Sequence, residues 1–215
     1  MSAIVFAKSP GIPVTPPSGT TASFVDTTTI SRFKYVDDAG GVVIVGPVPT
    51  VSVVTNTLYG ASNIYLAGSG IVVNAGAWKA QTIYRCIFTG TKTGEASNVV
   101  INIRLGNTGT TSDASVCSFT FAAGTTVTDT GRFEVVATFR TVGSGTSAVV
   151  QGWAGCSHAF ASTGFTATGN AGYGLILTTS SGFDSTTQTH IGISAAWGAT
   201  PAVTVRQVQA RLMGI

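Results

Sequence analysis

The sequence predicts an all-β protein whose main body is an antiparallel two-sheet β-sandwich. The first observation is strict alternation of apolar residues, which places one apolar face on a strand because residues i and i+2 point the same way. It is clearest at Phe133, Val135, Ala137 and Phe139. The second is a set of Gly-rich turns between such runs, as at 143–145. The third is composition: 27 Gly and only 9% charged residues leave few strong helix formers.

Residues 1–22 are predicted to be an extended arm. They contain Pro10, Pro13, Pro16 and Pro17, and proline fixes φ and removes backbone donors. We expect this arm to dock on a neighbouring subunit, with a plain disordered tail as the alternative.

Residues 31–45 are predicted to form a small β-hairpin. Arg32–Val36 alternates, 42–45 is β-branched, and Asp37-Asp38-Ala39-Gly40-Gly41 supplies the turn. The two Asp side chains are expected to cap this turn; a cation site is the alternative, although calcium takes six or more oxygens. A lone hairpin is marginal, so we expect Phe33 and Tyr35 to join the four prolines in anchoring the protein.

A linker at 46–49 divides the chain into an anchoring segment, 1–48, and a sandwich domain, 49–215. Strands are expected at 51–59, 64–66, 71–73, 82–91, 98–105, 115–121, 132–142, 147–154, 172–178, 187–197 and 202–212. In the last of these the apolar parity switches near Arg206-Gln207, which predicts a β-bulge. The eight clearer segments, from 82–91 onward, suit a sandwich of jelly-roll type, although the pattern alone does not separate that topology from an immunoglobulin-like one.

Charge and cysteine usage exclude several function classes. The net charge is +3, and the basic residues are scattered, which argues against a nucleic-acid surface. Cys86, Cys117 and Cys156 form no CxxC motif and are expected to be buried free thiols. No leader and no apolar run of about 18 residues is visible, so we expect synthesis in the cytoplasm and no membrane partner.

No catalytic or metal motif stands out, so we expect no enzyme activity and no cofactor. Cys156 and His158 offer too few ligands for zinc and lack a visible carboxylate to orient the histidine. Glu95 and Glu134 are the only glutamates. Glu134 lies on the outer face of its strand, where pairing with a basic residue is expected.

Several stretches carry a family resemblance: TIYRCIFTGTKTG after Ala77-Trp78-Lys79, VVINIRLGNTGT, DTGRFEVVATFRTVGSGTSAVVQGW, DSTTQTHIGISAAWGATPAVTVRQVQARLMG and SFVDTTTISRFKYVDDAGGVVIVG. Together they resemble jelly-roll structural proteins on the virions of tailed bacteriophages: head decoration, head fibre and tail-fibre-like proteins. The resemblance implies a homotrimer on the capsid surface that binds the major capsid protein or other virion proteins. It carries no catalytic residues.

Three functions remain open at this stage. The first is a capsid decoration or minor head protein attached through its arm. The second is a tail-fibre or receptor-binding tip that holds host-surface glycans by aromatic stacking, with Trp78, Trp153 and Tyr173 as candidate contacts and Trp197 as a further one. The third is a glycan hydrolase, which needs two converging carboxylates that the sequence does not reveal.

Overall fold

The structure is a computed structural model of the 215-residue chain. It describes residues 6–9, 22–26, 32–36, 42–44, 48–58, 62–158, 164–165, 174–179, 182–198 and 203–214; before residue 50 and in 174–179 only the backbone is described. The chain forms two compact units, Pro49–Leu212 and Met1–Val48 with Met213–Ile215. The described residues hold no helix of the length and apolarity needed to cross a membrane.

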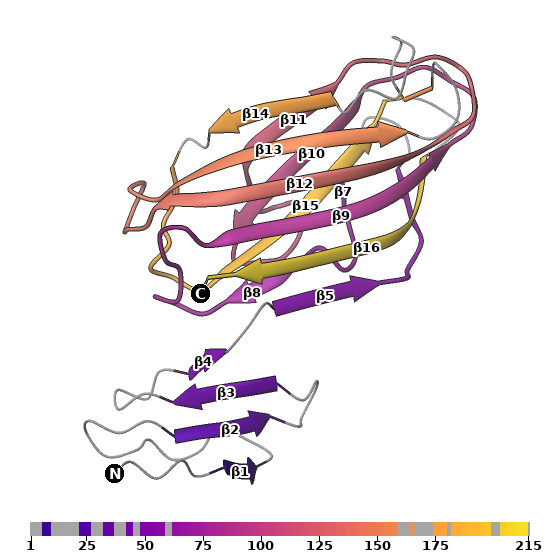
Figure 1. Ribbon diagram of the computed structural model, residues 1–215. Coiled ribbons are helices and arrows are strands. Elements are labelled where there is room, and N and C mark those ends of the chain that lie inside the picture. Colours follow the sequence, from indigo (N-terminus) through magenta and orange to yellow (C-terminus); the bar gives the residue numbers. More distant parts are fainter. Residues whose placement is uncertain are drawn as a thin grey trace. The chain divides into compact units, whose positions relative to one another are not determined.

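The larger unit is a β-sandwich of two antiparallel sheets, as the sequence predicted. The large sheet has the order β14 (Gly174–Thr179), β13 (Val149–His158), β12 (Asp129–Thr141), β9 (Ile83–Lys92), β16 (Val203–Met213) and β5 (Val48–Ser52), with β6 (Asn56–Leu58) also paired to β16. Figure 1 shows the long strands of this sheet in front of the second one.

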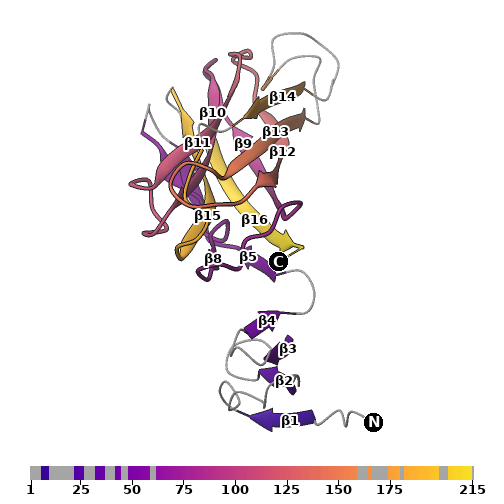
Figure 2. The same cartoon turned by 90° about the vertical axis from the view of Figure 1, so that its left-hand side faces the viewer.

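The small sheet has the order β11 (Ala114–Phe121), β10 (Val99–Gly106), β15 (Thr189–Trp197) and β7 (Ile64–Tyr65), and β8 (Ile71–Val73) also pairs with β15. Strand β10 pairs with β15 without a register shift, from Val99 opposite Trp197 to Gly106 opposite His190. In Figure 2, β10, β11 and β15 lie to the left and β12, β13 and β14 to the right. The chain therefore passes from the large sheet (β9) to the small (β10, β11), back to the large (β12–β14), and again to the small (β15) and the large (β16).

The core lies between the two sheets, where apolar side chains alternate inward from both. The apolar face that the sequence predicted at Phe133, Val135, Ala137 and Phe139 is buried, and so are Val99, Ile101, Ile103, Phe119, Phe121, Ile191, Ile193 and Trp197. Phe133 stacks on Phe88 with ring centroids 5.0 Å apart and meets Phe121 and Phe165 edge-on. Such aromatic pairs add about 0.5–1.5 kcal/mol each beyond the area they bury.

Strand β16 changes phase where the sequence predicted it. Val203 and Val205 are buried, Arg206 and Gln207 are both exposed, and Val208 begins a second buried series. The shift keeps apolar side chains inward on both halves of the strand. It also turns Gln207, Gln209 and Arg211 outward.

The smaller unit carries a four-stranded sheet in the order β1 (Phe6–Ser9), β2 (Ala22–Asp26), β3 (Arg32–Val36) and β4 (Val42–Ile44). Strands β3 and β4 pair antiparallel, with Tyr35 opposite Val43, and form the expected hairpin. Strand β1 was not predicted from the sequence; it pairs parallel with β2 and places Phe6 opposite Ser23. Phe6–Ser9 is therefore a paired strand within the segment predicted to be an extended arm. A four-residue run is too short for alternation to reveal it.

Candidate functional site

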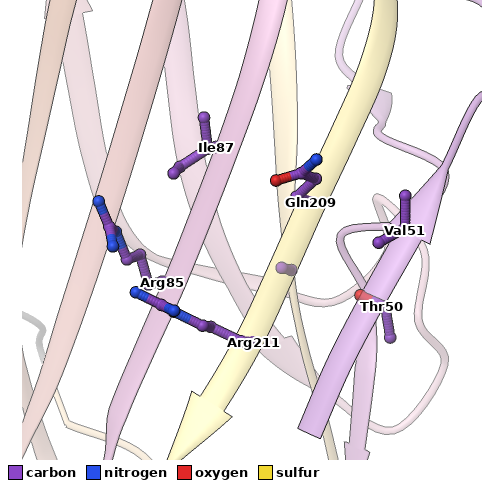
Figure 3. A pocket seen from close by; sticks show the side chains of 7 residues that line it. Thr50, Val51, Arg85, Ile87, Gln209 and Arg211 are labelled. Atoms are coloured by element: carbon purple, nitrogen blue, oxygen red, sulfur yellow. The ribbon is translucent and has the colours of Figure 1, made fainter. Parts of the chain in front are cut away.

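The outer face of the large sheet is hollowed along β9. One depression of about 240 Å³ is lined by Thr50, Val51, Arg85, Ile87, Gln209, Ala210 and Arg211 (Figure 3). A second, of about 360 Å³, adjoins it and shares Ile87 and Gln209. A third, of about 230 Å³, shares Thr89 and Arg132 with the second. The three depressions together form one groove, which we call the β9 groove.

Side-chain length explains the hollow. Strand β9 has β12 on one side and β16 on the other, and its outward residues in the middle of the strand are the short Ile87 and Thr89. The neighbouring strands present longer side chains on the same face, namely Arg132 on β12 and Gln207, Gln209 and Arg211 on β16. Short residues between rows of long ones leave a channel that follows the strand.

Glu134 is held by two arginines on one wall of the groove. Arg85 donates from Nε to Glu134 Oε1 at 2.6 Å, with its Nη2 also 2.6 Å from that oxygen. Arg132 Nη2 lies 3.0 Å from Oε2. The Glu134 side chain is only 11% exposed, so this pairing satisfies a largely desolvated carboxylate. The expectation that Glu134 pairs with a basic residue is confirmed.

Arg211 has no such carboxylate. Its side chain forms no ion pair or hydrogen bond with the residues that the structure describes. Figure 3 shows its side chain extending from β16 across β9 toward Arg85. Both Nε and Nη2 of Arg85 contact Glu134, and Nη1 makes no hydrogen bond with the residues that the structure describes. The Arg211 side chain thus brings a second guanidinium group toward Arg85.

A second cluster of ionisable groups is sealed inside the sandwich. His158 Nδ1 lies 2.8 Å from Asp129 Oδ2, and both side chains are fully buried. The same carboxylate oxygen accepts the Phe165 N–H at 3.0 Å. Asp129 is therefore the orienting carboxylate for His158 that the sequence analysis did not find, because the two residues are 29 positions apart and meet only when β12 pairs with β13.

This cluster is nevertheless unsuited to nucleophilic catalysis. Cys156 is buried, and burial together with the nearby Asp129 charge raises the pKa of its thiol to about 12. A reactive cysteine needs a lowered pKa and access to substrate. The cluster instead fixes strand ends: Asp129 holds the backbone at Phe165, and the same carboxylate contacts His158 at the end of β13.

Lys92 is the buried cation beside this cluster. It is opposite Asp129 in the β9–β12 pairing, and its Nζ donates to the carbonyl oxygens of Gly94, Glu95 and Thr125. The ammonium also lies 5.8 Å from the centre of the Trp197 ring. Burial lowers the pKa of Lys92, and the Asp129 carboxylate opposes that change. Among the described residues, no group of three or more His, Cys, Asp or Glu side chains is placed to hold a metal ion.

The candidate glycan contacts do not gather at one place. Trp78 is 4% exposed and stacks on Phe139 at 4.0 Å, so its ring belongs to the core. Trp197 is buried as well. Trp153 is half-buried on the outer face of the large sheet, opposite Val136 of β12. Tyr173 lies outside the described residues.

The anchoring candidates fall where little side-chain detail is described. Pro10, Pro13, Pro16 and Pro17 lie outside the described residues, as do Asp37 and Asp38. Phe33 and Tyr35 lie in β3, opposite Val25 and Ser23 of β2. The three cysteines are free and buried, as predicted.

The groove residues Gln209 and Arg211 were not among the sequence candidates. A signal for them was present: once the parity of the last strand switches, Gln207, Gln209 and Arg211 occupy the outward series. What the sequence did not reveal is that β16 lies beside β9, which brings Arg211 near Arg85. Comparison of the chain with family models, with curated proteins and with solved structures gives no match.

Proposed function

We propose that the protein is a non-enzymatic structural protein of a tailed-bacteriophage virion, carried on the capsid surface as a decoration or minor head protein. The observation that supports this most is that acidic side chains of the sandwich make structural contacts. Asp129 and Glu134 bind neighbouring strands and backbone, and Asp113 binds the turn before it. A sandwich in which these three acids are committed to structural contacts suits a mechanical role better than a catalytic one.

The strand order supports the jelly-roll expectation. From β9 onward the chain crosses between the two sheets four times, and β16 returns between β5 and β9. Such crossings between facing sheets are typical of jelly rolls, whose Greek-key connections link strands far apart in sequence. The resemblance of the sequence to virion jelly-roll proteins points the same way.

We further propose that residues 1–48 attach the protein to the major capsid protein or another virion protein, and that it acts as a homotrimer. The boundary between the two compact units falls at Val48. The smaller unit has short strands of three to five residues, and sheets this small gain stability by packing on another surface. An edge strand such as β1 also offers free backbone groups to which a partner strand can pair.

Deletion of residues 1–48 tests the attachment. Because β1 pairs with β2, a cut after residue 22 would divide the small sheet, whereas a cut after Val48 follows the boundary between the units. The shortened protein should keep the β-type circular dichroism of the full chain and lose binding to particles that lack the native protein. Unchanged occupancy on such particles would show that attachment lies in the sandwich.

The alternative function is a tail-fibre or receptor-binding tip that contacts host-surface glycans. The β9 groove favours it, because it provides guanidinium, amide and hydroxyl groups on one open face. The half-buried Trp153 lies on the same face, two strands from β9.

A further inference from the structure

The β9 groove carries an excess of positive charge. Arg85, Arg132 and Arg211 face it, and Glu134 is the one carboxylate among the described groups there. Glu134 already bridges Arg85 and Arg132. The balance of these four groups is therefore +2, and Arg211 is the group with no anion beside it.

Convergence of two guanidinium groups without an anion between them is unfavourable. Arg85 is already paired with Glu134, but Arg211 brings a further positive charge toward it, and like charges at a protein surface repel each other. A long arginine side chain on an open strand face can point away from another cation, yet Arg211 extends toward Arg85 (Figure 3). A carboxylate or sulfate between them would accept charge-assisted hydrogen bonds from both.

The neutral lining indicates what else the ligand carries. Beside the two arginines lie the Gln209 amide and the apolar side chains of Ile87 and Val51, and the groove continues past Gln207 and Thr89. Amide groups both donate and accept hydrogen bonds. A surface that mixes such groups with aliphatic side chains matches a sugar ring, which presents hydroxyl groups at its edge and C–H groups on its face.

We propose that the β9 groove binds an acidic oligosaccharide, with one sugar carboxylate held between Arg211 and Arg85 Nη1 and the adjoining rings lying toward Gln207 and Arg132. The first depression, at about 240 Å³, is smaller than the range of about 300–1,000 Å³ for drug-sized ligands. It therefore accommodates a single sugar unit that carries a carboxylate. The adjoining depression of about 360 Å³ accommodates its neighbour.

Other occupants fit the groove less well. A second copy packed on the groove through a twofold axis would place one face of charge +2 against another, and this repulsion would destabilise the dimer. A peptide that adds a strand needs a sheet edge, whereas β9 is an inner strand with partners on both sides. Nucleic-acid binding would require more positively charged side chains than the three arginines of this groove, whose lining includes no lysine.

The inference deepens the alternative function and does not rest on the capsid location. It is therefore tested on the purified full-length protein, without particles, by isothermal titration with a short oligogalacturonate. Its methyl ester and inorganic sulfate serve as comparison ligands. We expect saturable binding of the oligogalacturonate that weakens as salt rises. Arg211→Gln should weaken it at least tenfold, and Arg85→Gln by a similar factor.

Arg206→Gln is the matched control. Arg206 is exposed on the same strand, does not line the groove, and its change removes the same charge. Because Arg85→Gln also disrupts the Glu134 bridge, the thermal midpoint of each variant is measured, and the Arg211→Gln result decides. Absence of oligogalacturonate binding at millimolar concentration would overturn the proposal. So would equal binding of the methyl ester or of sulfate alone, or an equal loss in Arg206→Gln.

Discussion

At the scale of single residues, Asp113, Asp129, Glu134 and Asp184 act as hydrogen-bond acceptors that fix local structure. Asp113 is the clearest example: its carboxylate accepts the Thr108 and Gly109 N–H groups at 3.0 and 2.8 Å and the Thr108 hydroxyl at 2.6 Å. Gly109 has a φ of 67°, a left-handed value that glycine adopts without strain. One carboxylate thus closes the turn between β10 and β11.

The Asp113 turn should make stability depend on acid pH. Burial alone would raise the pKa of Asp113, but the hydrogen bonds from Thr108, Gly109 and Thr110 hold it below its ordinary value. A lowered folded-state pKa gives stability that is present above the unfolded pKa of about 3.9 and is lost as pH falls through the folded value. Asp113→Asn should therefore lower the free energy of unfolding by about 1–3 kcal/mol at neutral pH.

The difference between wild type and Asp113→Asn should narrow as the pH falls from about 5 toward 2. Urea denaturation across this range measures it. Asp184, whose pKa the Thr186 hydroxyl and N–H also lower, keeps its contribution in both proteins and cancels from the comparison. A difference that stays constant with pH would mean that the carboxylate charge plays no part.

At the scale of elements, strands with strict alternation could be predicted from the sequence. Very short strands, and contacts between residues far apart in the sequence, could not. The 10-residue β9 and the phase shift in β16 follow directly from the spacing of apolar residues. Strand β1 has four residues, too few for a periodic signal. The Asp129–His158 contact and the approach of Arg211 to Arg85 depend on which strands become neighbours, which alternation within one strand does not encode.

The close contact of β13 with the small sheet gives an element-scale prediction. A Cβ placed on Gly152 would lie 2.9 Å from Phe119 Cζ, 3.0 Å from Ile103 Cδ1 and 3.4 Å from Cys117 Sγ. All three atoms belong to the facing sheet, so a side chain at Gly152 pushes the two layers apart. Gly152→Val should lower the free energy of unfolding by about 1–3 kcal/mol.

Thr120→Val is the control for Gly152→Val. Thr120 is exposed on β11, so the same β-branched side chain there meets no facing sheet and should change stability by less than about 0.5 kcal/mol. Chemical denaturation of both variants measures the two values. Equal stability of Gly152→Val and wild type would show that the sheets are not closely packed at this point.

At the scale of the whole molecule, the small number of charges suits association between copies. Charged residues make up 9% of the chain, against about 25% in ordinary soluble domains. Interface cores are depleted in charge because desolvating an ion is costly. Because the β9 groove carries a net charge of +2 and is assigned to a ligand, we expect contacts between copies on the remaining surface of the sandwich.

We predict a homotrimer in solution. Light scattering coupled to size exclusion, at micromolar concentration of the full chain, should give a mass three times the 21.8 kDa of one chain. The same measurement on Arg211→Gln should give the same mass, since the groove is assigned to a ligand and not to a second copy. A monomer would contradict the prediction.

The central proposal, a decoration protein on the phage capsid, is tested most directly by counting copies on the particle. Particles that lack the native protein are incubated with excess purified full-length chain, washed, and analysed by quantitative mass spectrometry against the major capsid protein. We predict saturable binding at a copy number that scales with the number of capsid subunits. Binding of only a few copies per particle, all at the tail, would contradict the decoration role and favour the receptor-binding tip.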